Sequence, residues 1–270
     1  MKKLVGFFAF LALITSSTLA VGAERKYKNS LDWGTGLNMG TVGMYEYPGE
    51  NVYARGIDFS MRYPRFIDDS WGLFLEGDIS YNSASRSRYF SKLDKLDGGK
   101  YTYDRFTLCP STQGRFVSSA FIGGVYRYDI GNWSFRPRAG FGVAGYLYQR
   151  NKYYRTIGTG EESVTQAVMI LPSDDESSGI RYDIPACKLG LQTNYFLTKH
   201  FYLALDLDLN IFLSHHVFRQ KIYNTEKRGN SLFDALAMED YKRTDLVSST
   251  RINTYTPPMG AVRFTIGFDF

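Results

Sequence analysis

The fold is decided by residues 201–214, which read FYLALDLDLNIFLS. Leucine or isoleucine occupies every second position from Leu203 to Leu213, and the positions between them hold Ala, Asp, Asn and Phe. A helix would scatter these leucines around its circumference, whereas a strand places them all on one face. The stretch therefore predicts a β-strand with one apolar face, on which we expect Leu207→Arg to cost more stability than Asp208→Asn.

The same alternation recurs along the chain. Residues 261–270, AVRFTIGFDF, form a strand that runs to the final residue. Six further segments fit the pattern, namely 30–46, 53–65, 71–82, 116–129, 133–149 and 182–196. Each is longer than the ~9–11 residues that a tilted membrane strand requires. The sequence thus predicts eight strands.

The connections between these segments alternate in length. The short ones are 65–70, 130–132 and 197–200, and the long ones are 83–115, 150–181 and 218–255. The first outer connection, 47–52 with its Pro48-Gly49 turn, is the short exception. Short turns at one end, long loops at the other and an even strand count are typical of an up-and-down antiparallel transmembrane barrel. We expect the long loops to contribute few ladder hydrogen bonds, with either a short helix or a disordered loop over 231–241.

The N-terminus reads as a secretory signal peptide over residues 1–23. Lys2 and Lys3 precede an apolar stretch, and cleavage is expected after Ala23, with Ala20 as the alternative. Removing the two lysines from the 32 basic residues leaves 30 against 27 acidic ones, which is no electrostatic signature of nucleic-acid binding. Beyond residue 20 no segment approaches the ~20 apolar residues of a spanning helix, so a membrane protein of this sequence must be a barrel. Residues 24–270 are expected to form that single barrel domain.

Period two alone does not separate a membrane barrel from a soluble one with apolar side chains inside, so the second face decides. That face combines small, amide and hydroxyl residues with seven acids and six bases. The charged positions expected to line the lumen are Asp32, Asp58, Arg62, Glu76, Asp78, Arg127, Arg136, Arg138, Lys188, Asp206, Asp208, Arg263 and Asp269. Nearly balanced charge suits a network of buried ion pairs better than a solvated surface, which would carry more Lys and Glu. The apolar face is therefore predicted to point outward into lipid.

Aromatic residues cluster near the strand ends, on or beside the apolar face. They are Trp33, Tyr63, Trp71, Tyr81, Tyr126, Tyr128, Trp133, Tyr195 and Phe270. Trp and Tyr concentrate at the two membrane–water interfaces of transmembrane proteins. Their collective placement supports the outward assignment.

On these residues, with the segment 184–191 (IPACKLGL) and the terminal Phe268-Asp269-Phe270, the chain resembles the small eight-stranded outer-membrane barrels. That class includes the OmpA transmembrane domain, OmpX, OmpW and porin-like β-barrel domains. The resemblance implies an outer-membrane monomer of a Gram-negative cell, surrounded by membrane lipids and lipopolysaccharide. It also implies an assembly signal, Phe264, Ile266, Phe268 and Phe270, read by the barrel assembly machinery. The chain departs from the usual form of that signal at Thr265, where Gly is common.

Residues that could support catalysis are few. The histidines are His200, His215 and His216, and the last two follow Ser214 near the outer end of a strand. The position resembles that of the Ser and His of lipid A-modifying barrels, with Asp183, Asp206 or Asp208 as acidic partner. Adjacent side chains on a strand point to opposite faces, however, so one constellation can use only one of these histidines. Rim residues at the lipopolysaccharide level are the favoured interpretation.

No metal spacing, phosphate-binding loop or dinucleotide fingerprint is present in the sequence, so we expect no cofactor. Cys109 and Cys187 are too few for a disulfide scaffold, although an oxidising envelope would permit them to pair. Eight strands leave an interior just filled by side chains, which disfavours an open porin. We therefore predict a non-enzymatic barrel with a structural or surface-binding role through its long loops. A lipid A-modifying enzyme and a narrow small-solute channel are the alternatives.

Overall fold

The structure is a computed structural model. It describes residues 27–44, 47, 49–103, 114–148, 151–158, 163–171, 180–213, 215–227, 241–255 and 257–270. The expected signal peptide over residues 1–23 and Cys109 lie outside the described residues. The same holds for the helix considered over 231–241, except that Tyr241 begins a strand.

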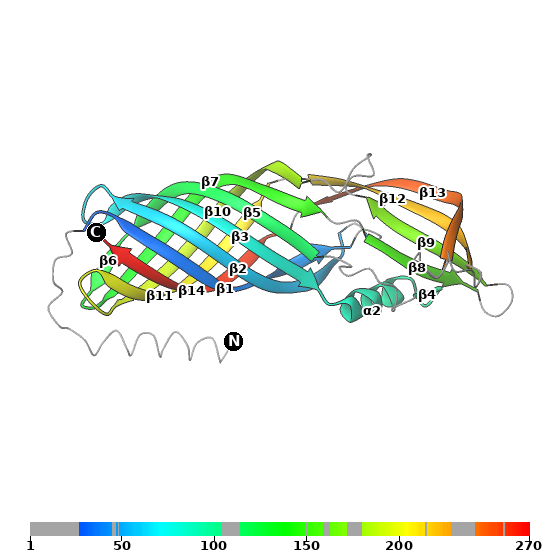
Figure 1. The fold of residues 1–270 in the computed structure, drawn as a ribbon, viewed down its shortest axis with the longest axis horizontal. Coiled ribbons are helices and arrows are strands. Elements are labelled where there is room, and N and C mark those ends of the chain that lie inside the picture. The colour runs from blue at the N-terminus through cyan, green and yellow to red at the C-terminus, as the bar shows by residue number, and fades with distance from the viewer. Residues whose placement is uncertain are drawn as a thin grey trace, which may run out of the picture.

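Eight antiparallel strands close into a barrel (Figure 1), which confirms the predicted fold. They are β1 (Ser30–Gly43), β2 (Asn51–Phe66), β3 (Trp71–Ala84), β5 (Gly114–Tyr126), β7 (Trp133–Tyr148), β10 (Ile180–Phe196), β11 (Phe201–Phe212) and β14 (Met259–Asp269). Each strand pairs with the next along the barrel, and β14 pairs with β1 to close the ring. Closure leaves every barrel strand with two neighbours, as a membrane-spanning sheet requires.

One detail of the barrel differs from the expectation drawn from the sequence, and a second explains a glycine of β1. The strand expected over 116–129 is interrupted at Arg127, after which β6 (Tyr128–Ile130) forms a tight hairpin with β7. Close packing between β1 and β14 explains the glycine at position 36. A Cβ there would lie 2.6 Å from the Arg263 Cα on the neighbouring strand, so only glycine permits this close approach of β1 to β14.

The expectation that the long connections add few ladder hydrogen bonds is wrong. They form a second, five-stranded antiparallel sheet in the order β13-β12-β9-β8-β4. Its strands are β4 (Tyr101–Tyr103), β8 (Asn151–Ile157), β9 (Val164–Leu171), β12 (His215–Lys227) and β13 (Tyr241–Tyr255). The alternation did not reveal them because side chains on both faces of these strands are partly buried. Tyr153 and Tyr154 are adjacent on β8, yet both are buried.

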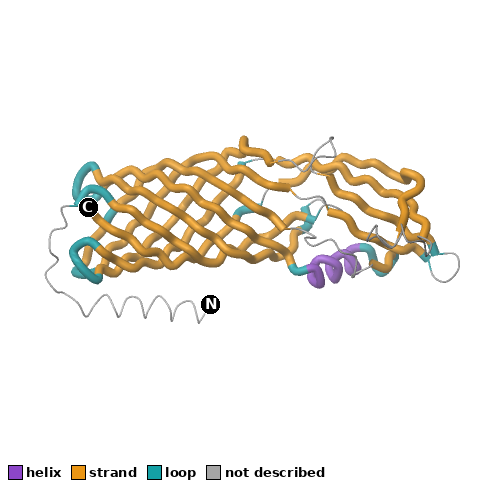
Figure 2. The backbone as a smooth tube through the Cα atoms, in the orientation of Figure 1, coloured by secondary structure: helices purple, strands orange, loops and turns teal. Residues whose placement is uncertain are grey.

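The second sheet, here called the outer sheet, continues half of the barrel wall. Within a few residues β7 leads into β8, β11 into β12 and β13 into β14, and β9 precedes β10 with residues 172–179 between them. The pairings β8–β9, β9–β12 and β12–β13 repeat the barrel order of β7–β10, β10–β11 and β11–β14. Figure 2 shows the strands running from the barrel into this extension. The outer sheet is therefore built on four strands that the membrane domain already fixes.

One helix, α2 (Arg86–Leu96), lies beside the outer sheet, directly after β3 (Figure 1). It buries Tyr89, Phe90 and Leu93 on one side. Phe90 packs edge to face against Tyr153 of β8, with ring centroids 5.8 Å apart. The helix thus packs against the β4–β8 side of the outer sheet, and we call the helix and the sheet together the outer module.

Among the described residues, no helix is long and apolar enough to cross a membrane.

Candidate functional site

The barrel exterior is a continuous apolar surface. Leu207 is 44% exposed, and its neighbours across the β11–β14 and β10–β11 ladders are Val262 and Leu191. The large exposed side chains of the barrel strands are almost all aliphatic or aromatic. Such a surface would be unfavourable in water over so large an area. It is the surface that hydrocarbon chains of a bilayer would contact.

Aromatic pairs lie at the short-turn end of this apolar band. Trp71 packs against Tyr126 and Trp133 against Tyr195, each with ring centroids 4.9 Å apart. Strand ladders make both pairs, because the residues are cross-strand partners. Amphipathic rings at this level belong to the membrane–water interface.

The interior has the opposite chemistry. The structure buries all thirteen charged residues assigned to the lumen from the sequence. Lys188, for example, is 0% exposed. Neighbouring positions of the same strands alternate between this interior and the apolar exterior, so the strand period places each charge inside.

Glu76 of β3 is the centre of the main ion-pair cluster. One of its carboxylate oxygens lies 2.6 Å from the Lys188 ammonium and 3.2 Å from the Arg263 guanidinium. The other lies 3.4 Å from Arg138 and 3.6 Å from Arg62. Four cations from β2, β7, β10 and β14 thus converge on a single carboxylate. The cluster links strands on opposite sides of the barrel.

Other carboxylates of the cluster contact the same cations. Asp206 accepts from Arg138 at 2.9 Å, and Asp208 contacts Arg138 and Arg263. Gly190 of β10 makes room for this arrangement. A Cβ at that position would lie 2.8 Å from the Arg138 guanidinium carbon. The glycine was not among the lumen residues expected from the sequence.

A second polar layer lies nearer the short-turn end. The Arg136 guanidinium donates to Asp269 at 3.0 Å and to the Tyr202 hydroxyl at 2.9 Å. The Tyr202 hydroxyl donates in turn to Asp32, which also receives Arg62 at 2.8 Å. Tyr202 therefore joins the two layers. Sequence reasoning missed it, although its inward position on β11 is given by the same alternation as Asp206.

Arg127 closes the short-turn end of the barrel. Its guanidinium donates to the carbonyls of Asp69 and Tyr27 at 3.0 Å and 2.9 Å. It also stacks over the Phe66 ring, 4.1 Å from the centroid. Arg127 thus binds backbone carbonyls at the mouth and lies 3.8 Å from the Asp129 carboxylate.

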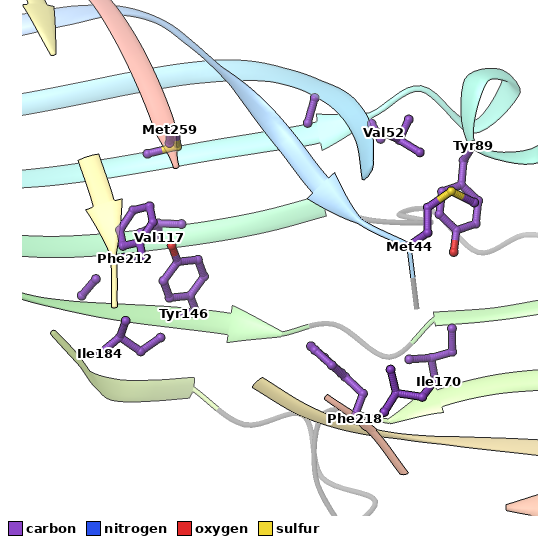
Figure 3. Close-up of a cluster of buried hydrophobic side chains, with 14 of the residues drawn as sticks. Met44, Val52, Tyr89, Val117, Tyr146, Ile170, Ile184, Phe212, Phe218 and Met259 are labelled. Carbon is purple, nitrogen blue, oxygen red and sulfur yellow. The ribbon is translucent and has the colours of Figure 1, made fainter. Parts of the chain in front are cut away.

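The other end of the lumen is closed by apolar side chains. Figure 3 shows Val117, Tyr146, Ile184, Phe212 and Met259 gathered in this region from different barrel strands. All five are buried, and Tyr146 packs edge to face on Phe212 with centroids 5.2 Å apart. An apolar layer, the ion-pair cluster and the Arg136 layer thus follow one another along the lumen. In a barrel of eight strands, side chains such as these just fill the interior.

Of the residues considered for catalysis, His215 and His216 pair through their backbones with Tyr255 and Thr254 in the outer sheet. Their side chains, the side chain of Asp183 and Ser214 lie outside the described part of the chain. Asp206 and Asp208 are engaged by lumen arginines. Among the described residues no group of three or more His, Cys, Asp and Glu is placed to hold a metal ion. Cys187 is a free, partly exposed thiol on β10.

The residues expected to form the assembly signal lie on the lipid-facing side of β14. Phe264, Ile266, Phe268 and Phe270 are all exposed there. His200 stacks on Phe268 at 5.4 Å between ring centroids, and its Nδ1 lies 2.8 Å from the Asp269 carbonyl oxygen. The turn before β11 therefore holds the end of the chain in place. Recognition by the assembly machinery stays a prediction.

No family model and no curated protein matches this chain. Solved structures with a similar fold include Neisserial surface protein A, at 8% identity and a TM-score of 0.40, covering 90% of this chain and 97% of that one. The attachment invasion locus protein Ail of Yersinia pestis is 11% identical with a TM-score of 0.37, covering 90% and 99%. A major outer membrane protein of Thermus thermophilus is 11% identical with a TM-score of 0.41, covering 91% and 100%.

The class of this protein follows from its own barrel rather than from these likenesses. Eight strands close without a free edge, the exterior is apolar with aromatic pairs near one border, and the interior is ion-paired. Closed antiparallel barrels of this kind are the spanning structures of outer membranes. The chain is an eight-stranded outer-membrane barrel.

Proposed function

We propose that the protein is a non-catalytic surface-binding barrel that presents its outer module to a macromolecule outside the cell. The observation that carries this proposal is the continuity of the outer sheet with the barrel wall. Four strands run on past the membrane domain in unchanged order. A binding surface built on such strands is held rigidly, so little ordering entropy is lost when a partner binds.

The surface offered for binding is β13. In the described part of the chain it pairs with β12 alone, so its other edge is open. Leu246 is 53% and Val247 is 50% exposed, at an irregularity in the pairing with β12. The regularly paired residues Ser249, Thr250 and Arg251 are exposed as well, and adjacent residues of a regular strand point to opposite faces. Both faces of β13 are therefore accessible over 249–251. A strand with one open edge and two accessible faces can make backbone and side-chain contacts together.

The same proposal covers the surroundings of the barrel. The apolar exterior would contact outer-membrane lipids and lipopolysaccharide, and the strand β14 would present its exposed aromatics to the barrel assembly machinery. We propose a monomer, because a lipid-facing barrel needs no second copy to cover its apolar band. The filled lumen and the engagement of Asp206 and Asp208 by arginines favour binding over conduction or lipid A chemistry.

The test compares cells that produce the wild-type protein with cells that produce Leu246→Asp/Val247→Asp. Binding is measured to sister cells, to an immobilised polysaccharide and to an immobilised protein. We expect the wild type to bind at least one of these probes and the double variant to lose that binding. Val164→Asp is the matched control, since Val164 is an exposed apolar residue of β9 in the same sheet. Heat-modifiable migration on gels checks that each barrel is folded.

Four results would contradict the proposal. The first is equal binding by producing and non-producing cells to every probe. The second is full binding by the double variant. The third is a change in lipid A acylation that depends on the protein and disappears in His215→Ala/His216→Ala, which would favour the enzyme. Ion conductance of wild-type proteoliposomes would favour the channel instead.

A further inference from the structure

An arginine lies exposed on the lipid-facing side of β2. Arg55 is exposed on the same face as Ile57, Phe59 and Met61. Among the described residues it has no ion-pair or hydrogen-bond partner for its guanidinium, whereas the arginines of the main lumen cluster contact carboxylates. A guanidinium stays charged at all physiological pH values, so Arg55 is free to bind an anion from its surroundings.

The height of Arg55 in the membrane follows from the strand. On β2 the outward positions from 57 to 63 are apolar, and Arg55 and Arg65 flank them. Ten residues at ~3.4 Å span ~34 Å of strand, and a tilt of about 40° reduces this to ~26 Å along the membrane normal. That distance matches the ~25 Å apolar band of outer-membrane barrels. Arg55, on the side of the outer module, therefore lies at the level of the outer headgroups.

A second arginine approaches the same place from α2. The Arg88 guanidinium lies over the ring of Tyr53, 5.7 Å from its centroid. Tyr53 and Arg55 point outward from alternate positions of β2, about 7 Å apart. The nearby Lys92 is already neutralised, because it contacts the Glu50 carboxylate at 2.7 Å and the Asn51 carbonyl at 2.6 Å. Two arginines thus lie beside the exposed Tyr53, Arg55 on the same strand and Arg88 over its ring.

We propose that Arg55 and Arg88 bind a phosphate group of the outer-leaflet glycolipid, lipid A. Guanidinium groups match phosphate oxygens through two parallel N–H donors, which a phosphate can accept from two arginines at once. The acyl chains of the same lipid would lie along the apolar row from Ile57 to Tyr63, directly below. The site needs the outer-membrane placement of the barrel but not the surface-binding role proposed above, so either can fail alone.

The experiment measures lipid binding to the purified, folded barrel in detergent by native mass spectrometry. The probes are bisphosphorylated lipid A, dephosphorylated lipid A and inorganic phosphate. We expect Arg55→Gln/Arg88→Gln to weaken lipid A binding at least tenfold, since each charge-assisted hydrogen bond to phosphate strengthens binding by about a factor of ten. The lipid A affinity of Arg55→Lys/Arg88→Lys should lie between those of the wild type and the glutamine double variant, because lysine keeps the charge but cannot donate two parallel hydrogen bonds.

Two controls remove a charge elsewhere. Arg65→Gln takes an exposed arginine from the other border of the band on the same strand, and Lys95→Gln takes a cation two turns farther along α2. Both should change lipid A binding less than twofold. Should the double variant fail to fold on a gel, Arg88→Gln alone, on the exposed side of the helix, tests the same site.

Three outcomes would overturn the proposal. One is undiminished lipid A binding by every folded arginine variant. Another is equal binding of dephosphorylated lipid A, which would assign the affinity to the acyl chains. The last is displacement of lipid A by an equal concentration of inorganic phosphate, which would indicate a general anion site instead of a lipid site.

Discussion

The lumen of the barrel and the core of the outer module are buried in opposite ways. In the lumen, Glu76 and its cations fill the space with charge. In the outer module, Phe90, Ile170 and Phe218 form an ordinary apolar core. The difference follows from the surroundings. Water outside the outer module favours burying apolar groups, whereas lipid around the barrel gives no such advantage and leaves polar side chains only the interior.

The change from charged to apolar buried side chains occurs along the strands themselves. Inward positions of β11 run from Asp206 through Asp208 to Phe212, and Phe218 follows on β12. On β14 the buried positions run from Met259 to Arg263 to Asp269. The strand geometry is the same throughout, but the chemistry of the inward face changes at the level where the apolar layer begins.

Removing the central carboxylate should produce the largest effect. Glu76→Gln leaves four buried cations with one acceptor charge fewer, and breaking such a buried network costs about 3–5 kcal/mol. The free energy of unfolding would be measured by urea titration of the barrel in detergent. Glu50→Gln is the control, since Glu50 is 47% exposed and pairs only with Lys92 in a surface salt bridge worth about 0–1 kcal/mol. Equal stability losses would contradict the central role of Glu76.

A charged residue on the lipid-facing side of the barrel should lower the free energy of unfolding somewhat less than Glu76→Gln does. Leu207→Arg places a guanidinium among lipid-facing leucines and is expected to lose about 2–4 kcal/mol in the same urea titration, performed in lipid vesicles. The sequence alone ranked Asp208→Asn as milder. The structure changes that ranking, because Asp208 contacts Arg138, Lys188 and Arg263. Tolerance of Leu207→Arg would mean that water, and not lipid, covers this face.

A small truncation in the outer module should act locally. Ile252 of β13 is buried opposite Phe218, and Ile252→Val removes one methylene at a cost of about 0.5–1.5 kcal/mol. We expect faster proteolysis of the outer sheet and an unchanged urea midpoint for the barrel. A shift of the barrel midpoint by the full amount would show that the two regions unfold as one unit.

The smallest effect is expected in the turn between β2 and β3. The backbone N–H groups of Trp71 and Ser70 donate to Asp68 at 2.6 Å and 2.7 Å, and they lower the pKa of this fully exposed carboxyl. Its folded pKa lies below its unfolded one, so its contribution is present above an unfolded pKa of about 3.9 and is lost as the pH falls through the folded value. Amide exchange at Trp71 should therefore quicken in acid, relative to its intrinsic rate. Asp68→Asn should remove that pH dependence, and an unaltered profile would argue against the carboxylate.

Much of the candidate site could be predicted from the sequence. The position of Asp206 or Arg263 inside the barrel needs only the period of two, because one outward leucine fixes the direction of every neighbour. The ion-pair partners could not be predicted, because residues such as Glu76 and Lys188 meet only when strands distant in the sequence face each other across the lumen. Tyr202 and Gly190 were missed for the same reason: their roles come from Arg136 and Arg138 on another strand.

The sequence by itself determined the number of barrel strands, their alternation and which face meets lipid, because these depend on residue order along one strand. Tertiary structure alone decided the ion pairs of the lumen and the existence of the outer sheet. Strands β8, β9, β12 and β13 carry weak periodicity, and they pair because the barrel strands that adjoin them already lie side by side in that order. Once the barrel holds their ends together, closing each outer hairpin costs little chain entropy, and the sheet continues outward.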